Sequence, residues 1–167
     1  MSRPQCSPDV GGQSQLLLAR VRKELDRLRR NEPDQGTARF GGVGKVRRGV
    51  NHLLREVALW LCIEERLDAD AELQALAIGP RKLERATAGQ AAKLVQHLAA
   101  RPSARRAPVR QICQDLTARA STIWMVIQLG NVNEHGEEED PEPRVLIPAL
   151  RQLESLMDEV VRQQQAP

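Results

Sequence analysis

The sequence predicts an all-α protein, an up-down helical bundle of five to six helices. Apolar residues recur three and four positions apart along most of the chain, and this period is typical of helices that bury one face. No stretch alternates apolar and polar residues as a half-buried strand does. Stretches rich in Gly, Pro and Asp separate the periodic segments and predict where helices begin and end. Short connections of this kind favour helices that run up and down around one core.

Domain organisation follows from the length of the chain and from the composition of its first residues. With 167 residues, the chain is long enough for one domain with its own core. Residues 1–13 contain two prolines and two adjacent glycines, and we predict that they form a disordered N-terminal tail. Residues 14–164 are predicted to form a single helical bundle domain.

The first helix is predicted over residues 14–30, with Ser14 as its N-cap. An apolar seam runs along this helix at spacings of three and four, formed by Leu18, Val21, Leu25 and Leu28. The seam either packs on the core of its own chain or forms a contact with another protein, such as a second copy. The opposite face is rich in arginine and is suited to follow nucleic-acid phosphates.

Residues 32–44 are predicted to be a linker that ends in several closely spaced glycines. The spacing of these glycines before Lys45 is similar to that of a phosphate-binding loop. However, Arg39 stands where that loop needs glycine, and Val46 stands where it needs Ser or Thr. We therefore interpret the glycines as a hinge rather than as a nucleotide site.

Five further helices are predicted from the same apolar period, with boundaries set by Gly, Pro and capping signals. Their ranges are residues 45–67, 68–78, 87–100, 109–129 and 144–162. Thr87 and Gln90 match the capping box, in which each side chain bonds the other residue's backbone N–H. Pro148 falls early in the last helix, where proline is tolerated.

Charge is unevenly distributed along the chain. Residues 1–66 contain 13 Lys and Arg against 8 Asp and Glu, and residues 67–133 contain 9 against 5. Residues 134–167 contain 3 against 9, so an acidic end follows a basic body. Such a body either attracts polyanions such as RNA or is a solvated surface without a partner. Because aromatic residues make up 2% of the chain, the main contact with a nucleic acid is expected to be to phosphate rather than by base stacking.

The predicted nucleic-acid-binding residues belong to three basic clusters, on the first helix, at the start of the second helix and in a Pro- and Arg-rich loop. They are Arg20, Arg27, Arg30, Lys45, Arg47, Arg48, Arg101, Arg105 and Arg106. Arginine and lysine are suited to this role because both donate charged hydrogen bonds to phosphate oxygens.

The three cysteines, Cys6, Cys62 and Cys113, do not have the spacing of metal ligands. Cys62 and Cys113 lie in apolar segments and are predicted to be core residues in a reducing compartment. No metal or other cofactor is expected. No run of 18 apolar residues predicts a membrane span, and no apolar signal core begins the chain, so we expect no membrane partner and a cytoplasmic location.

The octapeptide Leu129 to Gly136, Leu-Gly-Asn-Val-Asn-Glu-His-Gly, gathers side chains that are capable of chemistry. An imidazole such as that of His135 can accept a proton from a ribose 2′-hydroxyl, which then attacks the adjacent phosphate without a metal. Asn131 is four residues earlier, so a continuing helix would place both side chains on one face. The alternative is that the octapeptide only terminates a helix, with His135 interacting with the helix end.

This octapeptide resembles the signature of the HEPN superfamily of helical bundles, in which Asn-x-x-x-His stands between the last two long helices. The segment Leu83 to Leu98 is similar to a Thr-Leu-Gly-Gln segment often found upstream, so the resemblance covers residues 83–161. It implies metal-independent RNA cleavage at a homodimer interface. In that role His135 is the base or acid and Asn131 is the orienting residue. Many members act in antiviral defence or in toxin–antitoxin pairs.

One position departs from the HEPN pattern, which has arginine directly before the asparagine. That position is Gly130 here, and Arg119 is 11 residues upstream, about 16 Å away along a continuous helix. Loss of a guanidinium that stabilises charge on the phosphate costs about 2–4 kcal/mol of transition-state stabilisation. The resemblance therefore predicts a weakened or inactive ribonuclease, or one that a partner completes with an arginine.

Three functional hypotheses follow. The first is a HEPN-like, RNA-associated homodimer, whose ribonuclease activity depends on His135. The alternative is a non-enzymatic helical adaptor or small subunit of a larger nucleoprotein complex, which binds nucleic-acid phosphates with an affinity that falls with salt. The third is a protein-interaction module that uses the seam from Leu18 to Leu28.

Overall fold

A computed structural model describes residues 11–30, 42–101, 105–119, 122 and 143–165. The described residues form six α-helices and one short 3₁₀ helix, and no strand is present among them. The helices are α1 (Gly12–Arg29), α2 (Gly42–Glu64), α3 (Ala69–Ala75), η2 (Leu83–Arg85), α4 (Ala88–Ala100), α5 (Ala107–Ala118) and α7 (Pro143–Gln165). The prediction of an all-α helical bundle is confirmed.

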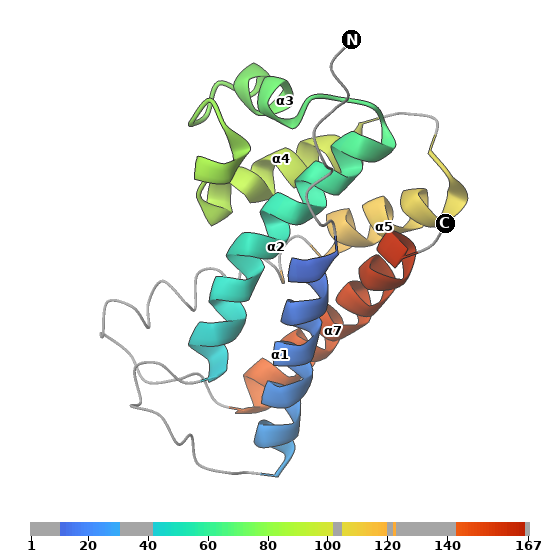
Figure 1. Ribbon diagram of the computed structural model, residues 1–167. Coiled ribbons are helices and arrows are strands. Elements are labelled where there is room, and N and C mark those ends of the chain that lie inside the picture. The colour runs from blue at the N-terminus through green and yellow to red at the C-terminus, as the bar shows by residue number, and fades with distance from the viewer. Residues whose placement is uncertain (1–10, 31–41, 102–104, 120–121, 123–142, 166–167) are drawn as a thin grey trace.

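The three long helices form the main body of the bundle, and Figure 1 shows α1 between α2 and α7. Ser14, near the start of α1, contacts Glu56 in the second half of α2, whereas Arg20 contacts Lys45 near the start of α2. Helices α1 and α2 therefore run antiparallel. Helix α7 is also antiparallel to α1, because Gly11 lies near Gln164, and Arg22 pairs with Glu154.

The second half of α2 packs against α4, and α5 packs against both α4 and α7. The core consists of the aliphatic faces of these helices. Its largest fully buried side chains include Leu17, Leu25, Leu53, Leu54, Leu61, Leu94, Leu98, Ile112, Leu150, Leu153 and Met157. All of these side chains belong to one continuous cluster, as expected for a single bundle around one core.

The apolar seam of α1 packs inside its own chain. Leu18, Val21, Leu25 and Leu28 are all buried in the core cluster. A seam that is covered by α2 and α7 has no apolar surface left for a second chain. The hypothesis of a dimer or partner contact through Leu18 to Leu28 is therefore wrong.

Helices α1 and α2 approach closely at Gly49. A Cβ atom at this position would lie 2.7 Å from Leu17 Cδ1 and 3.6 Å from Arg20 Nη1. No other residue type fits there without displacing Leu17, because real Cβ atoms do not approach a neighbour so closely. The glycine thus allows the start of α2 to lie directly against α1.

The start of α1 differs from the prediction, because Ser14 is not its N-cap. The helix begins at Gly12 and its N-cap is Gly11, whose φ of 121° is the left-handed region that favours glycine. Ser14 is fully buried in the first turn. Residues 11–13, predicted as part of a tail, therefore belong to the fold, and residues 1–10 lie outside the described residues.

Other helix boundaries also differ from the prediction, and two of these differences bear on the site. Helix α2 begins at Gly42, so Gly42 and Gly44 belong to its first turn rather than to a hinge. Helix α5 ends at Ala118 with Arg119 as its C-cap, and does not run unbroken to Leu129. The separation of about 16 Å between Arg119 and Gly130 assumed one continuous helix, and it no longer applies.

The start of α4 agrees with the prediction. Thr87 accepts the backbone N–H of Gln90 at 3.3 Å, and Gln90 accepts the backbone N–H of Thr87 at 2.9 Å. The predicted capping box is confirmed. Within the segments that the structure describes, no helix combines the length and the apolar character needed to cross a bilayer.

Candidate functional site

One face of α2 carries a row of basic side chains that we call the cationic stripe: Lys45, Arg48, His52 and Arg55. Their spacings of three, four and three residues place them on one face of the helix. The stripe is about 15 Å long at the rise of an α-helix. Lys45, Arg48 and His52 are exposed, and Arg55 is half-buried.

Arg20 of α1 joins the stripe from the neighbouring helix. Its Nη1 donates to the backbone carbonyl of Lys45 at 3.5 Å, so the guanidinium lies over the start of the stripe. The close approach of the two helices at Gly49 makes this contact possible, because Arg20 is one turn beyond Leu17. Two elements that are separate in sequence thus contribute charge to one surface.

A cavity of about 450 Å³ lies between α1 and α2 along this surface, and we call it the cationic groove. It is lined by Gln13, Leu16, Arg20, Lys45, Arg48 and His52. Three of these six side chains carry a permanent positive charge, and none of the described carboxylates lines the groove. The geometry suits an anionic ligand, because the groove concentrates positive potential in a hollow.

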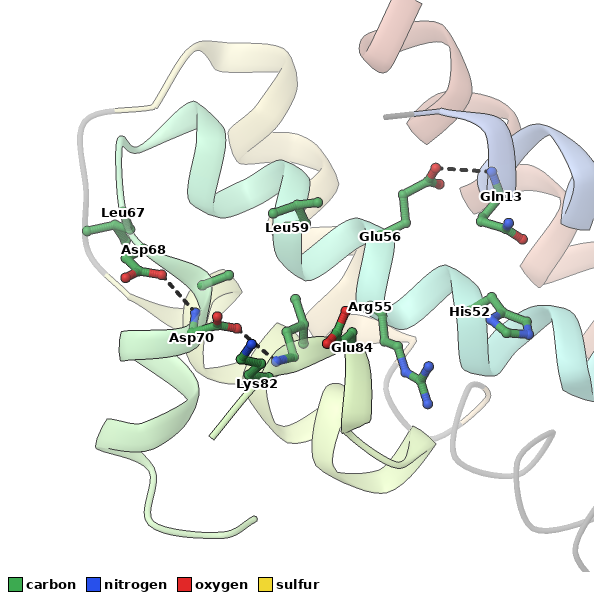
Figure 2. Close-up of a pocket in the computed structure, with 12 residues that line it drawn as sticks. Gln13, His52, Arg55, Glu56, Leu59, Leu67, Asp68, Asp70, Lys82 and Glu84 are labelled. Atoms are coloured by element: carbon green, nitrogen blue, oxygen red, sulfur yellow. Dashed lines mark hydrogen bonds between the residues drawn. The ribbon is translucent and has the colours of Figure 1, made fainter. Parts of the chain in front are cut away.

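A second cavity of about 680 Å³ shares Gln13 and His52 with the groove, and we call it the side pocket. It extends from α2 to the turn before α3 and to η2. Figure 2 shows Gln13 and His52 at one end of the side pocket, and Leu67 and Asp68 at the other. The two cavities are therefore neighbours, and Gln13 and His52 line both of them.

No described carboxylate neutralises the charges of the cationic groove. Within the described part of the chain, the side chains of Lys45, Arg48 and His52 form no hydrogen bond or ion pair. Arg55 donates its Nε–H to the carbonyl of Ala86 at 2.8 Å and pairs with no described carboxylate. Lys45, Arg48 and Arg55 therefore remain available to an anionic ligand, without the cost of breaking an existing ion pair.

Several arginines elsewhere on the described surface are paired with acids. Arg22 contacts Glu154 at 3.3 Å and Asp158 at 3.2 Å. Arg106 contacts Glu64 at 2.7 Å. The cationic groove differs from these surfaces, because its positive charges are not paired with described carboxylates and line a cavity.

The structure brings together three of the nine predicted nucleic-acid-binding residues: Arg20, Lys45 and Arg48. Arg47 lies in α2, but its side chain is outside the description. The other five are distributed over other surfaces. Arg27 pairs with Glu24, Arg30 follows the end of α1, Arg101 pairs with Glu72 at 3.3 Å, and Arg105 and Arg106 pair with Glu65 and Glu64.

Arg105 has a structural role. Its side chain is 5% exposed and donates to the carboxylate of Glu65 and to the carbonyls of Leu98 and Ala99, the last at 3.2 Å. The guanidinium thereby satisfies carbonyls in the last turn of α4 and links α4 to α2. Because none of these donors is free for a phosphate, we remove Arg105 from the phosphate-binding set.

His52 and Arg55 were absent from the predicted set, although they belong to the cationic stripe. The signal that could have identified them is the helical register, because both continue the spacing of Lys45 and Arg48 along one face of α2. The octapeptide with Asn131 and His135 lies outside the described residues. Among the described residues, no group of three or more His, Cys, Asp or Glu side chains is placed to hold a metal ion.

Comparisons with known proteins identify no relative. No family model matches the chain, and neither a curated protein nor a solved structure matches it. The resemblance to the HEPN superfamily therefore depends on the octapeptide and on residues 83–98.

Proposed function

We propose that this protein binds RNA through its phosphates, in the cationic groove between α1 and α2. The observation that carries the proposal is the set of cations in the groove that no described carboxylate neutralises, Arg20, Lys45 and Arg48. Arg and Lys side chains both donate charged hydrogen bonds to phosphate oxygens. Arg does so from a rigid, planar guanidinium, and Lys from an ammonium on a flexible stem. RNA rather than DNA is supported by the HEPN resemblance of the octapeptide.

The length of the cationic stripe supports a strand rather than an isolated anion. About 15 Å of helix surface can contact successive phosphates of one strand, whereas a single phosphate needs one or two donors. The scarcity of aromatic side chains agrees with recognition through the backbone, because the sequence offers only two Trp and one Phe for base stacking. The affinity is therefore expected to depend steeply on salt.

Fluorescence anisotropy with a labelled single-stranded RNA, at several KCl concentrations between about 50 and 200 mM, tests this proposal. The double variant Lys45→Gln, Arg48→Gln is expected to lower the slope of log K against log salt by about 1.4, because each phosphate contact on a single strand contributes about 0.7. The matched control is Arg22→Gln, Arg106→Gln, which removes the same charge from paired arginines. Binding that is insensitive to salt, or equal losses in both variants, would contradict the proposal.

Metal-independent RNA cleavage is a second candidate function, supported by the octapeptide. In this proposal His135 moves the proton of the 2′-hydroxyl, Asn131 orients the imidazole or the phosphate, and two copies of the chain meet at the site. Gly130 in place of arginine makes the predicted activity weak. A cytoplasmic location and a role in defence or in a toxin–antitoxin pair belong to the same proposal.

An RNA cleavage assay in excess chelator separates the enzyme from the non-enzymatic adaptor. Cleavage that His135→Ala abolishes and His97→Ala leaves intact supports catalysis, because His97 lies on α4, beside Glu72 rather than in the cationic groove. If the unmodified protein binds RNA without cutting it, the result supports the adaptor or small subunit of a nucleoprotein complex.

A further inference from the structure

The side pocket differs in chemistry from the cationic groove that it adjoins. Its wall includes four aliphatic side chains, Leu59, Leu67, Ala69 and Leu83. Leu59 and Leu67 are half-buried and pack against the core, so they present a fixed apolar surface rather than mobile side chains. Such a surface can cover one face of a planar ring without an aromatic partner.

Four carboxylates line the same pocket: Glu56, Asp68, Asp70 and Glu84. Glu56 already accepts backbone N–H groups at the start of α1. Asp68 accepts the backbone N–H of Asp70 at 3.0 Å, and Asp70 accepts the backbone N–H of Leu83 at 2.8 Å. Each of these bonds uses one carboxylate oxygen and holds the side chain in place. Glu84 forms no hydrogen bond with another described residue, so its carboxylate is an available acceptor.

Nitrogen-bearing basic side chains complete the pocket at the end that meets the groove. Arg55 and His52 line it there, and Lys82 lies near the acidic residues. A ligand that spans both cavities would therefore meet positive charge in the cationic groove, and an apolar wall with hydrogen-bond acceptors in the side pocket. A nucleotide has this distribution, because an anionic phosphate is joined through ribose to a flat base with polar edges.

We propose that the side pocket holds one unstacked base of the strand bound in the cationic groove, and that guanine is preferred. This inference rests on the proposed function of the groove and names its ligand as single-stranded nucleic acid. Guanine presents two adjacent donors, N1–H and N2–H, and can pair with both oxygens of one carboxylate. Uracil presents one donor between two carbonyl oxygens, which the carboxylates repel.

The size of the pocket is consistent with one nucleoside. A volume of about 680 Å³ is within the usual range for small-ligand sites. A base inside a duplex is paired and stacked, so it can enter only at the cost of unstacking. A duplex therefore occupies the groove without the pocket, whereas a single strand or a free guanine nucleotide occupies the pocket.

The test compares the affinities of an all-uridine RNA, the same RNA with one central guanosine, and a duplex of equal length, at one salt concentration. The expected result is that the guanosine strand binds at least about fivefold more tightly than the all-uridine strand, as a bidentate contact to a base provides. Competition by guanosine monophosphate, compared with uridine monophosphate, distinguishes a free nucleotide from a base within a strand. Competition by the free nucleotide supports the pocket, as does preference within the strand.

The diagnostic variant is Asp68→Asn, Glu84→Gln. Asparagine preserves the N-cap of α3, which Asp68 provides by accepting the N–H of Asp70, so the fold is retained. The variant is expected to abolish the preference for guanosine, while its affinity for the all-uridine strand stays equal or rises, because two negative charges are lost. The single variant Glu84→Gln is expected to act in the same direction. The control Glu154→Gln, Asp158→Asn removes equal charge on α7 and is expected to keep the preference.

The failure of this inference can be distinguished from the failure of the proposed function. If all three nucleic acids bind with the same affinity and no nucleotide competes, the pocket has no role. The salt-dependent loss in Lys45→Gln, Arg48→Gln would still support the groove. If no salt-dependent binding occurs at all, both proposals are overturned.

Discussion

Glu56 of α2 accepts the backbone N–H of Ser14 of α1 at 2.7 Å, 42 residues away in the sequence. The same carboxylate accepts the backbone N–H groups of Gly11 at 2.8 Å and of Gln13 at 3.0 Å, and the hydroxyl of Ser14. Both Glu56 and Ser14 are buried. The negative charge thus caps the N-terminus of α1 from another helix, where the unpaired N–H groups and the helix dipole favour an anion.

Replacing Glu56 is expected to destabilise the whole bundle. Glu56→Ala leaves buried N–H groups and the Ser14 hydroxyl without an acceptor, which is expected to lower the free energy of unfolding by about 3 kcal/mol. Urea denaturation measures the loss. Glu84→Gln, on an exposed side chain, is the control and is expected to change stability by less than about 0.5 kcal/mol. Equal stability of the Glu56→Ala variant and the parent would contradict the capping role.

The contact between Gly49 and Leu17 predicts that the effect of Gly49→Ala on stability changes sign when Leu17 is replaced by alanine. In the parent protein, Gly49→Ala forces Leu17 to move and is expected to destabilise by about 1 kcal/mol despite the better helix propensity of alanine. In a Leu17→Ala background the obstruction is removed, and the same substitution is expected to stabilise by about 1 kcal/mol. Urea denaturation of the four proteins gives the coupling energy. No coupling between the two sites would show that the helices do not meet as described.

Arg105 and Arg106 are adjacent in sequence, and their substitutions are expected to differ strongly. Arg105→Lys replaces a buried guanidinium that contacts three acceptors with a single ammonium, at an expected cost of about 3 kcal/mol of stability. Arg106→Lys alters a partly exposed pair with Glu64 and is expected to cost less than about 0.5 kcal/mol. Thermal or urea unfolding distinguishes the two. Similar losses would contradict a structural role specific to Arg105.

The folded protein is expected to lose stability at alkaline pH because the thiol of Cys62 is buried. Burial, followed by the nearby carboxylates of Glu72, Glu65 and Asp68, raises the pKa of the Cys62 thiol to about 12 from the ordinary value of 9.0. The folded state therefore keeps its proton where the unfolded state loses it. This contribution is fully present below pH 9 and is lost as the pH rises towards 12, by up to about 1.4 kcal/mol per pH unit.

The measurement is urea denaturation of the parent and of Cys62→Ala at several pH values on both sides of pH 9. The difference in stability between the two proteins isolates this thiol from the other groups that titrate at high pH. We expect the difference to be constant below pH 9 and to change steadily above it, to the disadvantage of the parent. Parallel stability profiles over the whole range would show that the thiol is not buried as described.

The helices with a strong local signal were predictable from the sequence. Leu150, Leu153 and Met157 repeat at helical spacing and are all buried in α7, and Thr87 and Gln90 form the capping box that their spacing indicates. Local patterns succeed there because one element contains the whole signal. The end of α5 at Ala118 was missed, because the apolar period continues past it and neither Gly nor Pro marks the break.

The candidate site was predictable only in part, because it depends on tertiary contacts. Lys45 and Arg48 were identified from their local charge, but their association with Arg20 requires the packing of α1 on α2 at Gly49. Likewise, no local rule connects Glu56 with Ser14. The start of α2 at Gly42 also overrides the low helix propensity of glycine, because the helix buries Val46 and Val50 in the core.

Gln13 links the capping contact to the ligand site, because its backbone N–H donates to Glu56 while its side chain lines both cavities. A strand that fills the two cavities would cover this first turn of α1 and restrain its opening. Hydrogen–deuterium exchange at the amides of Gln13 and Ser14 should therefore slow when the cavities are occupied. Those two amides would act as a built-in reporter of occupancy that needs no label.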